Sequence, residues 1–427
     1  MRKTLKIAAL AAACILALSA FAACAPRGKQ LAAAKDAAPL SYEEQNSPAL
    51  AAVREGAAGF AARFLAAAGE NFAEDGNAAV SPVSVYAAMA MAAECAAGKT
   101  REQLLAALNT DGQALREGFG LFYRSLSRDG KEKIVLSDSV WLDESVAFRQ
   151  DCLDTLAESY HCASFAADFR GANETANEAV RNFVKEQTNG LIDQDPSLGE
   201  TTRFALINTL YVKTKWDQEG NDLPETDETY AFRNADGTTV TTRLLRAYAE
   251  TGVAYEGENF TSFYAATNIG CRLVFLLPDE GLTPKDVFTQ ENIAAAADAD
   301  YGGYDENGSP RYGTRCLFPA FEAVYREDVS PILQDMGVTD LFTPACDLSA
   351  ALETEGESVL CNKVQHVARL KVEAKGIEGA AATIADAAPE SDEAPVEVSD
   401  FVVDRAFAYL LLAPDGTILF AGAVNKI

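Results

Sequence analysis

The stretch 77–104, NAAVSPVSVYAAMAMAAECAAGKTREQL, sets the centre of the fold. After four residues of extended type, Ser81 stands where a helix N-cap accepts a backbone hydrogen bond, and Pro82 stands where the first helical turn tolerates proline. The residues that follow, VSVYAAMAMAAECA, are almost all apolar, so neither face of this helix suits water. We therefore expect a helix in the middle of a large hydrophobic core.

Helical and strand patterns are unevenly distributed along the rest of the chain. Apolar residues at helical spacing predict helices mainly in the first half, and short alternating or apolar runs predict strands mainly in the second. Such segregation favours an α+β fold over alternating βαβ units. The predicted helices span 48–69, 100–108, 114–127, 149–159 and 174–188, and the predicted strands span 133–142, 204–213, 271–277 and 313–321.

The N-terminus has the layout of an export signal. Basic residues at positions 2, 3 and 6 precede an apolar run, and residues 1–23 are therefore predicted to be a signal peptide. Residues 21–24, FAAC, resemble a bacterial lipobox, in which the cysteine is acylated, although Phe21 replaces the usual Leu, Val or Ile. We expect a lipid on Cys24; a plain secretory signal and an uncleaved anchor are the alternatives.

The segment 24–47 contains alanine, proline and polar residues without sustained periodicity. We interpret it as a spacer that holds a domain over 48–427 away from a surface. The chain is then an exported bacterial protein, held on the cell surface by its lipid or released outside the cell.

Composition excludes several classes of function. The formal net charge of −27 is spread along the chain, so nucleic acid is a poor partner. Of the nine cysteines, seven remain beside Cys14 and Cys24, and their scattered spacings favour buried thiols over a disulfide framework. No Cys or His pair has ligand spacing, and we predict neither a metal nor a cofactor.

An enzyme would need a base, and the chain holds two histidines, His161 and His366. His161 precedes Cys162, but adjacent side chains on a strand point apart, so a nucleophile–His pair is unsupported. On its own, His366 within a strand is most simply an ordinary hydrogen-bonded histidine. We predict that the protein is not an enzyme.

The segment 376–388, GIEGAAATIADAA, lies between two strand-like regions and contains no proline before Pro389. Every residue in it keeps its backbone donor, so it could enter the middle of a sheet. Long loops inside a compact domain are usually functional or disordered. An alanine-rich surface loop or a short helix is the simpler alternative.

Motifs in the order of one family run along the chain from about residue 48 to 427. The stretch 77–104 resembles the serpin pattern of Asn, Ser-Pro and Ser before a buried helix, followed by Gly-x-Thr-x-x-Gln-Leu. FVKEQTNGLI (183–192) and ALINTLYVKTKW (205–216) are similar to a serpin helix end and a serpin central strand. CLFPAFEAVY, DMGVTDLFTPACDLSA, VQHVARLKVEAKG, FVVDRAFAYLLL and GTILFAGAV continue the resemblance.

The resemblance implies a serpin fold with three β-sheets, eight to nine helices and an exposed reactive-centre loop at about 374–400. In inhibitory members a protease attacks this loop and forms an acyl-enzyme. The cleaved loop then inserts into the main sheet and traps the protease. The resemblance therefore implies a monomeric inhibitor whose covalent target is an extracellular serine protease, or a cysteine protease.

The start of this loop resembles the inhibitory hinge of Gly, a small residue, Glu, four small residues and Thr. Ile377 replaces the usual Thr or Ser, and Ala374 stands where Glu is common, yet an uncharged β-branched residue suits a strand. A non-inhibitory carrier, chaperone or adhesion lipoprotein is the alternative function, and bulky or charged hinge residues would favour it. The hinge residues are Gly376, Ile377, Glu378, Gly379, Ala380, Ala381, Ala382 and Thr383.

The bond that the protease cleaves follows from counting along the loop. Counting from the hinge places the reactive bond between Glu390 and Ser391, whereas counting back from the downstream strand ends near Pro395. The acidic residues around Glu390 suit a protease with a basic pocket; cleavage after alanine and a merely solvating role for the acids are the alternatives. The other candidate positions are Ala387, Ala388, Asp392, Glu393, Ala394 and Pro395.

The resemblance also implies a hydrogen-bonded cluster that lets the main sheet open. Ser81, Ser84, Asn208 and His366 match its positions, and Trp216 matches the position where insertion begins. Simple core packing is the alternative for Trp216.

Overall fold

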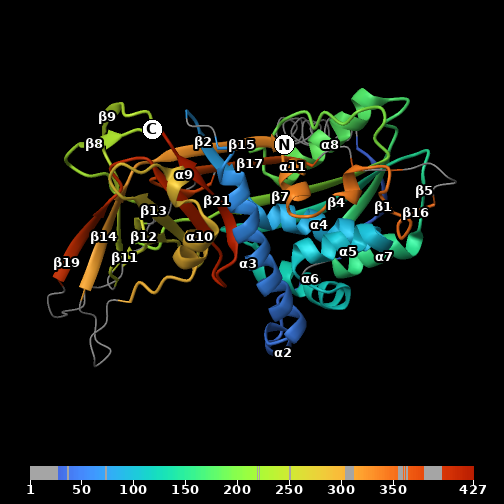
Figure 1. The fold of residues 1–427 in the computed structure, drawn as a ribbon, viewed down its shortest axis with the longest axis horizontal. Helices are drawn as coiled ribbons and strands as arrows, with labels where there is room; N and C mark the ends of the chain where they lie inside the picture. The colour runs from blue at the N-terminus through green and yellow to red at the C-terminus, as the bar shows by residue number, and fades with distance from the viewer. Residues whose placement is uncertain are drawn as a thin grey trace, which may run out of the picture.

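A computed structural model describes residues 27–35, 38–72, 75–218, 220, 222–249, 252–302, 312–353, 359, 361, 364–378 and 397–427 of the chain. Its strands form a main sheet in two parts, a six-stranded sheet, a three-stranded sheet and two pairs of short strands (Figure 1). This is the mixed fold of helices and sheets that the patterns predicted.

The main sheet consists of two blocks of strands. In the first block, β4 pairs with β6 in parallel and with β7 antiparallel, while β1 adds an outer strand to β6. In the second block, β17 pairs antiparallel with β15 on one side and with the short β18 on the other. The strands are β1 (Lys29–Ala32), β3 (Arg128–Asp129), β4 (Lys133–Asp143), β6 (Cys162–Ala167), β7 (Phe204–Lys213), β15 (Phe321–Asp328), β17 (Gln365–Glu373) and β18 (Gly376–Ile377).

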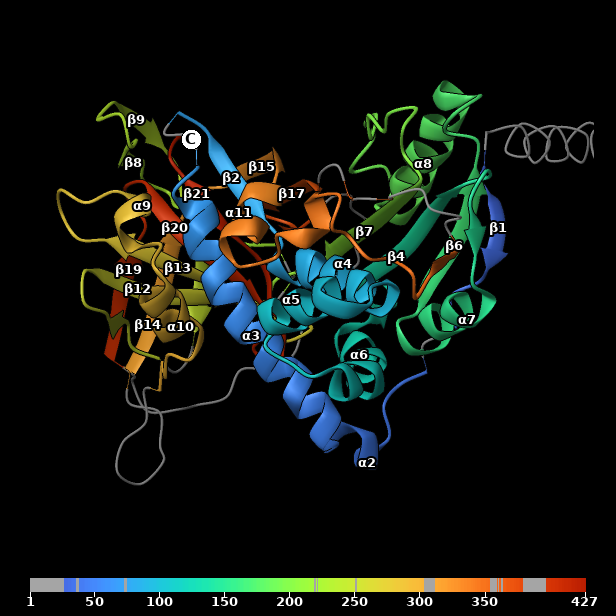
Figure 2. The ribbon, with the colours of Figure 1, turned by 45° about the vertical axis from the view of Figure 1, so that its right-hand side comes forward.

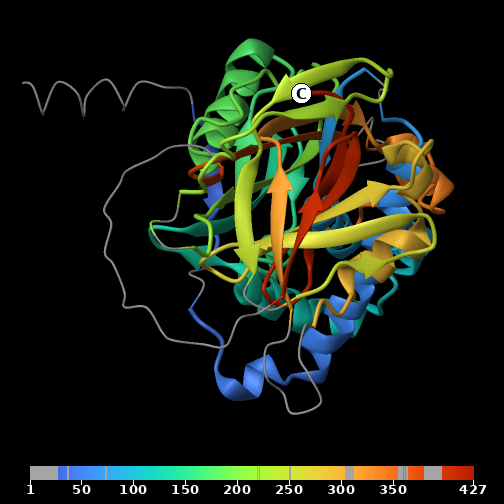
Figure 3. The ribbon, with the colours of Figure 1, turned by 90° about the vertical axis from the view of Figure 1, so that its left-hand side faces the viewer.

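The C-terminal strands belong to the other sheets. The six-stranded sheet is antiparallel throughout, with β20 and β21 in its interior. In the three-stranded sheet, β14 pairs antiparallel with β10 and in parallel with β19 (Figure 3). The strands are β11 (Tyr255–Glu256), β12 (Phe260–Ala266), β13 (Arg272–Pro278), β20 (Phe407–Leu412), β21 (Ile418–Val424) and β2 (Asn77–Val80), then β10 (Leu245–Ala249), β14 (Tyr312–Phe318) and β19 (Glu397–Val402), and the pairs β5 (Ala147–Phe148) with β16 (Leu352–Glu353) and β8 (Tyr230–Arg233) with β9 (Thr239–Thr242).

Ten α-helices are described where eight or nine were expected, and two of them, α2 and α9, have four residues each. All 14 residues of α4 are buried, as its apolar sequence predicted, and Ser81 caps its first turn by accepting from the backbone N–H of Ser84. The helices are α2 (Tyr42–Gln45), α3 (Pro48–Gly69), α4 (Pro82–Cys95), α5 (Gly98–Leu108), α6 (Gly112–Leu126), α7 (Gln150–Ser159), α8 (Asn173–Gln187), α9 (Pro284–Val287), α10 (Gln290–Ala297) and α11 (Ser330–Asp335), with one 3-10 turn, η1 (Asp340–Phe342).

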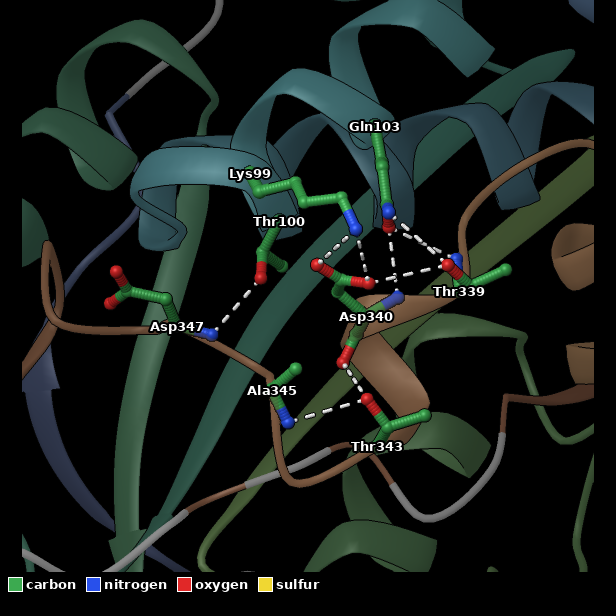
Figure 4. A network of polar contacts seen from close by, with 8 residues as sticks. All are labelled: Lys99, Thr100, Gln103, Thr339, Asp340, Thr343, Ala345 and Asp347. Atoms are coloured by element: carbon green, nitrogen blue, oxygen red, sulfur yellow. Dashed lines mark hydrogen bonds and ion pairs between the residues drawn. The ribbon is translucent and has the colours of Figure 1, made fainter.

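The polar end of the stretch 77–104 fastens a distant loop (Figure 4). The side-chain oxygen of Gln103 accepts hydrogen bonds from the backbone N–H groups of Thr339 (3.1 Å) and Asp340 (2.8 Å). The hydroxyl of Thr100 accepts another from the N–H of Asp347 (3.0 Å). These two side chains satisfy the backbone of a loop that enters the second block of the main sheet.

Residues 27–35 and 38–47, within the predicted spacer, contact the rest of the fold. Lys29–Ala32 form β1 at the edge of the main sheet (Figure 2), and Arg124 of α6 donates to the backbone carbonyls of Ala38 and Pro39. The carboxylate of Glu44 pairs with the same guanidinium at 2.8 Å. A four-residue strand needs only an open neighbouring edge, which the composition of the segment cannot reveal.

The described residues contain neither a cluster of metal ligands nor a helix that is long and apolar enough to cross a membrane. His161 is not positioned to act as a base for Cys162. Its Nδ1 lies 2.8 Å from the carbonyl oxygen of Lys35, while the Cys162 thiol donates to the carbonyl of Ala163. Burial raises the pKa of Cys162 well above its usual value, which disfavours a reactive thiolate.

Candidate functional site

The two blocks of the main sheet leave a slot between them, which we define as the space between the facing edges of β7 and β17. Within the described part of the chain, no backbone hydrogen bond joins β7 directly to β17. Instead β18 lies between them at one end, paired with β17 and bridged to Thr214 just after β7. The first hinge residues therefore occupy the place of a central strand.

Backbone hydrogen bonds hold the hinge on both sides. Thr214 and Ile377 exchange two N–H···O bonds, at 3.0 and 2.9 Å, and the N–H of Glu378 donates to the carbonyl of Lys371 at 3.0 Å. The indole N–H of Trp216 donates to the carbonyl of Glu373 at 2.9 Å, beside the turn into β18. Trp216 thus lies where the sheet receives the hinge.

The surroundings of β18 explain why its two residues are a glycine and an aliphatic residue. Gly376 has φ +138°, and a Cβ there would lie 2.1 Å from the carbonyl oxygen of Thr214, so a side chain would force the strand away. Ile377 is 1% exposed. The departure from Thr or Ser at this position is therefore accommodated by burial of the aliphatic side chain.

Beyond the hinge, the slot continues as a cavity of about 410 Å³. Its walls include β7, β17, Ala88, Met89 and Ala92 of α4, and the segment that follows α8. Three buried polar atoms of its lining have no hydrogen-bond partner among the described residues: Gln194 Oε1, Asn208 Oδ1 and Thr209 Oγ1. Unpaired polar atoms in a buried site are costly.

The structure brings together three of the five residues that the resemblance predicted for sheet opening. The backbone N–H of Ser81 donates to Nε2 of His366 at 3.0 Å, and the Ser81 hydroxyl donates to Ser84 at 2.9 Å. Asn208 lines the cavity but donates its Nδ2 hydrogen to Asp138 of β4. Trp216 lies apart from the others, at the hinge.

Asp138 and Tyr211 are residues of this region that sequence reasoning missed. Burial raises the pKa of Asp138 to about 7, against the opposing effect of the hydrogen bond from Asn208. An acidic residue in the middle of the buried strand 133–143 was a signal that could have flagged it. Tyr211 contacts Glu378, and no local pattern marks it.

The remaining candidate residues lie outside the described part of the chain. They are Gly379, Ala380, Ala381, Ala382 and Thr383 of the hinge, all eight candidate positions for the reactive bond (387, 388 and 390–395) and the lipidation site Cys24.

His366 makes stability depend on pH. Burial lowers its pKa from 6.5 to about 4, consistent with a neutral ring that accepts from Ser81. The unfolded chain binds a proton below about pH 6.5 while the folded chain does not until about pH 4, so stability is full above 6.5 and falls as the pH drops to 4. We expect the free energy of unfolding to fall by up to about 3 kcal/mol over this pH range, and His366→Gln should remove this contribution to the pH dependence. Denaturant unfolding of both proteins at pH 7.5 and 4.5 measures it; equal acid losses would contradict the assignment.

Comparisons with known proteins agree with this architecture. Residues 55–427 match the family model described as "Serpin (serine protease inhibitor)". The chain is 28% identical over 396 residues to putative serpin-Z6C of Oryza sativa subsp. japonica (85% of this chain, 93% of the relative) and 27% identical over 371 residues to the leukocyte elastase inhibitor of Bos taurus (82% and 93%).

Solved structures share the fold at lower identity. The native state of the thermophilic serpin tengpin has a TM-score of 0.76 at 20% identity (94% of this chain, 100% of that chain). Human thyroxine-binding globulin in complex with its ligand has a TM-score of 0.72 at 20% identity (88% and 99%). Because the family model spans most of the chain and the solved relatives share its architecture, this protein belongs to the serpin family.

Proposed function

We propose that this chain is a suicide-substrate inhibitor of extracellular serine proteases, with cysteine proteases as a further target class. The nucleophile of the protease attacks a loop carbonyl, the peptide bond breaks, and the new amino terminus leaves while the carbonyl stays bound as an ester to a serine or as a thioester to a cysteine. Insertion of the freed loop into the slot then distorts the protease before water can hydrolyse that ester. The serpin itself supplies the trap and no catalytic group.

One observation carries this proposal: the described hinge residues, Gly376 to Glu378, lie between β17 and the end of β7, and the cavity of about 410 Å³ continues the slot beyond them. The pairings Ile377 with Thr214 and Ile377 with Val372 fix a register for further insertion. Six residues on from Ile377 is Thr383, and six residues back from Thr214 and Val372 are Asn208 and His366. Insertion in this register would place Thr383 between the two side chains that line the cavity.

The same register explains the composition of the hinge. Because Ile377 is buried toward the core, alternate residues Gly379, Ala381 and Thr383 would also face inward. All three are small, which suits a strand that must enter a packed sheet. The thyroxine-binding structural neighbour shares only the fold with this chain, and a carrier role would not require small residues at these positions.

Trapping of a protease is tested on denaturing gels. We expect the 25–427 protein, which keeps β1 and α2, to form a covalent complex that survives boiling in detergent with at least one member of a panel of serine and cysteine proteases. Mass spectrometry of the released C-terminal fragment then identifies the reactive bond, which we propose to be Glu390–Ser391. Cleavage by every protease without any complex would overturn the inhibitor proposal.

The N-terminal sequence suggests where the inhibitor is located. We propose that cleavage after residue 23 and acylation of Cys24 hold a monomer at the bacterial cell surface. Intact-mass measurement of the mature protein, before and after Cys24→Ser, distinguishes a lipoprotein from a secreted protein.

A further inference from the structure

The last described hinge residue, Glu378, buries a carboxylate in the main sheet. Its side chain is part of a residue that is 8% exposed, and Oε1 accepts a hydrogen bond from the hydroxyl of Tyr211 on β7. Oε2 is buried without a hydrogen-bond partner among the described residues. A buried carboxylate with one oxygen unpaired is more stable in water, so it leaves the sheet unless its remaining contact holds it there.

The backbone of Glu378 is also held under strain. Its φ is +146°, a conformation that residues with a side chain rarely adopt, although its N–H remains bonded to Lys371. Strain and burial both favour withdrawal of Glu378 from the sheet. Since residues 376–378 nevertheless lie in the sheet, their contacts must outweigh both, and the Tyr211 hydroxyl is the hydrogen-bond partner of the Glu378 side chain among the described residues.

Tyr211 is well placed for this task. Burial, and then its hydrogen bond to Glu378, raise the pKa of the phenol, so the hydroxyl keeps its proton and donates it to the carboxylate. The side chain of Asn189, just after α8, donates to the same hydroxyl at 3.3 Å. Tyr211 therefore links the hinge to the first block of the main sheet and to the segment after α8.

We propose that Tyr211 is a positioning residue that keeps the hinge seated through Glu378, so that insertion starts from a strand end already in place. Formation of the first hydrogen-bonded pairs is the slow part of adding a strand, because these pairs cost conformational entropy before most of the stabilising contacts have formed. The seating itself is a property of the uncleaved protein. Its effect on protease trapping rests on the proposed function.

Hydrogen exchange tests the seating without any protease. In Tyr211→Phe, peptides that cover Thr214 and Ile377 should exchange roughly tenfold faster than in the wild type, as expected for loss of a hydrogen bond to a charged group. The matched control is Tyr123→Phe, which removes another phenol whose hydroxyl donates to a backbone carbonyl, that of Leu136 at 2.7 Å. This control should leave both peptides unchanged.

A second variant separates seating from simple loss of stability. Glu378→Gln keeps a side-chain acceptor for Tyr211 but removes the buried charge, so exchange at Thr214 and Ile377 should be no faster than in the wild type. Equal exchange in Tyr211→Phe and Tyr123→Phe would overturn the proposal. So would release of the hinge by Glu378→Gln to the extent seen in Tyr211→Phe.

The consequence for trapping is measured separately. With a protease that the wild type traps, Tyr211→Phe should raise several-fold the number of inhibitor molecules consumed per protease, while Tyr123→Phe should not. If the wild type traps no protease but the exchange pattern holds, the seating stands and the inhibitor proposal fails. If the wild type traps a protease but Tyr211→Phe leaves the exchange of both peptides unaltered, the inhibitor proposal stands and the seating proposal fails.

Discussion

A single cut within 387–395 is expected to raise the melting temperature by at least about 10 °C. The freed segment would fill the slot and add on the order of ten backbone hydrogen bonds, each worth about 1 kcal/mol net. With an unfolding entropy of about 2 cal/mol/K per residue, a chain of this size gains roughly 1 °C for each kcal/mol. Thermal unfolding followed by circular dichroism, before and after limited proteolysis, measures the shift.

The control for this experiment is a cleaved protein that cannot insert. The melting temperature of Thr383→Glu should rise little after a cut at the same bond, because its carboxylate would have to enter the cavity beside His366. An unchanged melting temperature in the cleaved wild type would indicate a member of the family whose loop stays outside the sheet.

Thr383→Glu is expected to turn the inhibitor into a substrate. In the proposed inserted register, residue 383 would face inward between Asn208 and His366, and burial of an unpaired carboxylate there would cost several kcal/mol. Insertion then becomes slower than hydrolysis of the acyl-enzyme, and each 1.4 kcal/mol on its barrier is about a tenfold change in rate. The number of inhibitor molecules consumed per trapped protease should rise at least about tenfold, as measured by titration of protease activity.

The outward-facing control is Ala380→Glu. In the same proposed register residue 380 would lie opposite Tyr211 and Arg369, and the Arg369 guanidinium is partly exposed. A carboxylate there can remain hydrated or meet a cation, so trapping should be largely retained. Equal loss of trapping in both variants would contradict the register that the seated hinge defines.

Sequence reasoning succeeded where local chemistry determines structure. Ser81, Pro82 and the apolar run after them specified the capped, fully buried helix α4. Segregated helix and strand patterns indicated the α+β class. Such features depend on propensity and burial of neighbouring residues, which a single sequence displays.

Contacts between distant segments were harder to predict. The bond from Tyr211 to Glu378 joins residues 167 positions apart, and no spacing rule connects them. The edge strand β1 depends on an open edge of β6, and Asn208 bonds to Asp138, a residue outside the predicted cluster. The seated hinge follows from the gap between β7 and β17, which is a property of the assembled sheet.

The pairing of the C-terminal strands determines what a cut produces. β19 is bonded along its length to β14, while β20 and β21 are buried inside the six-stranded sheet between β13 and β2. A protein cut in the loop would consequently become a noncovalent complex of a long and a short polypeptide. Neither piece could leave without exposing the interior of a sheet, so a native gel would show one species where a denaturing gel shows two.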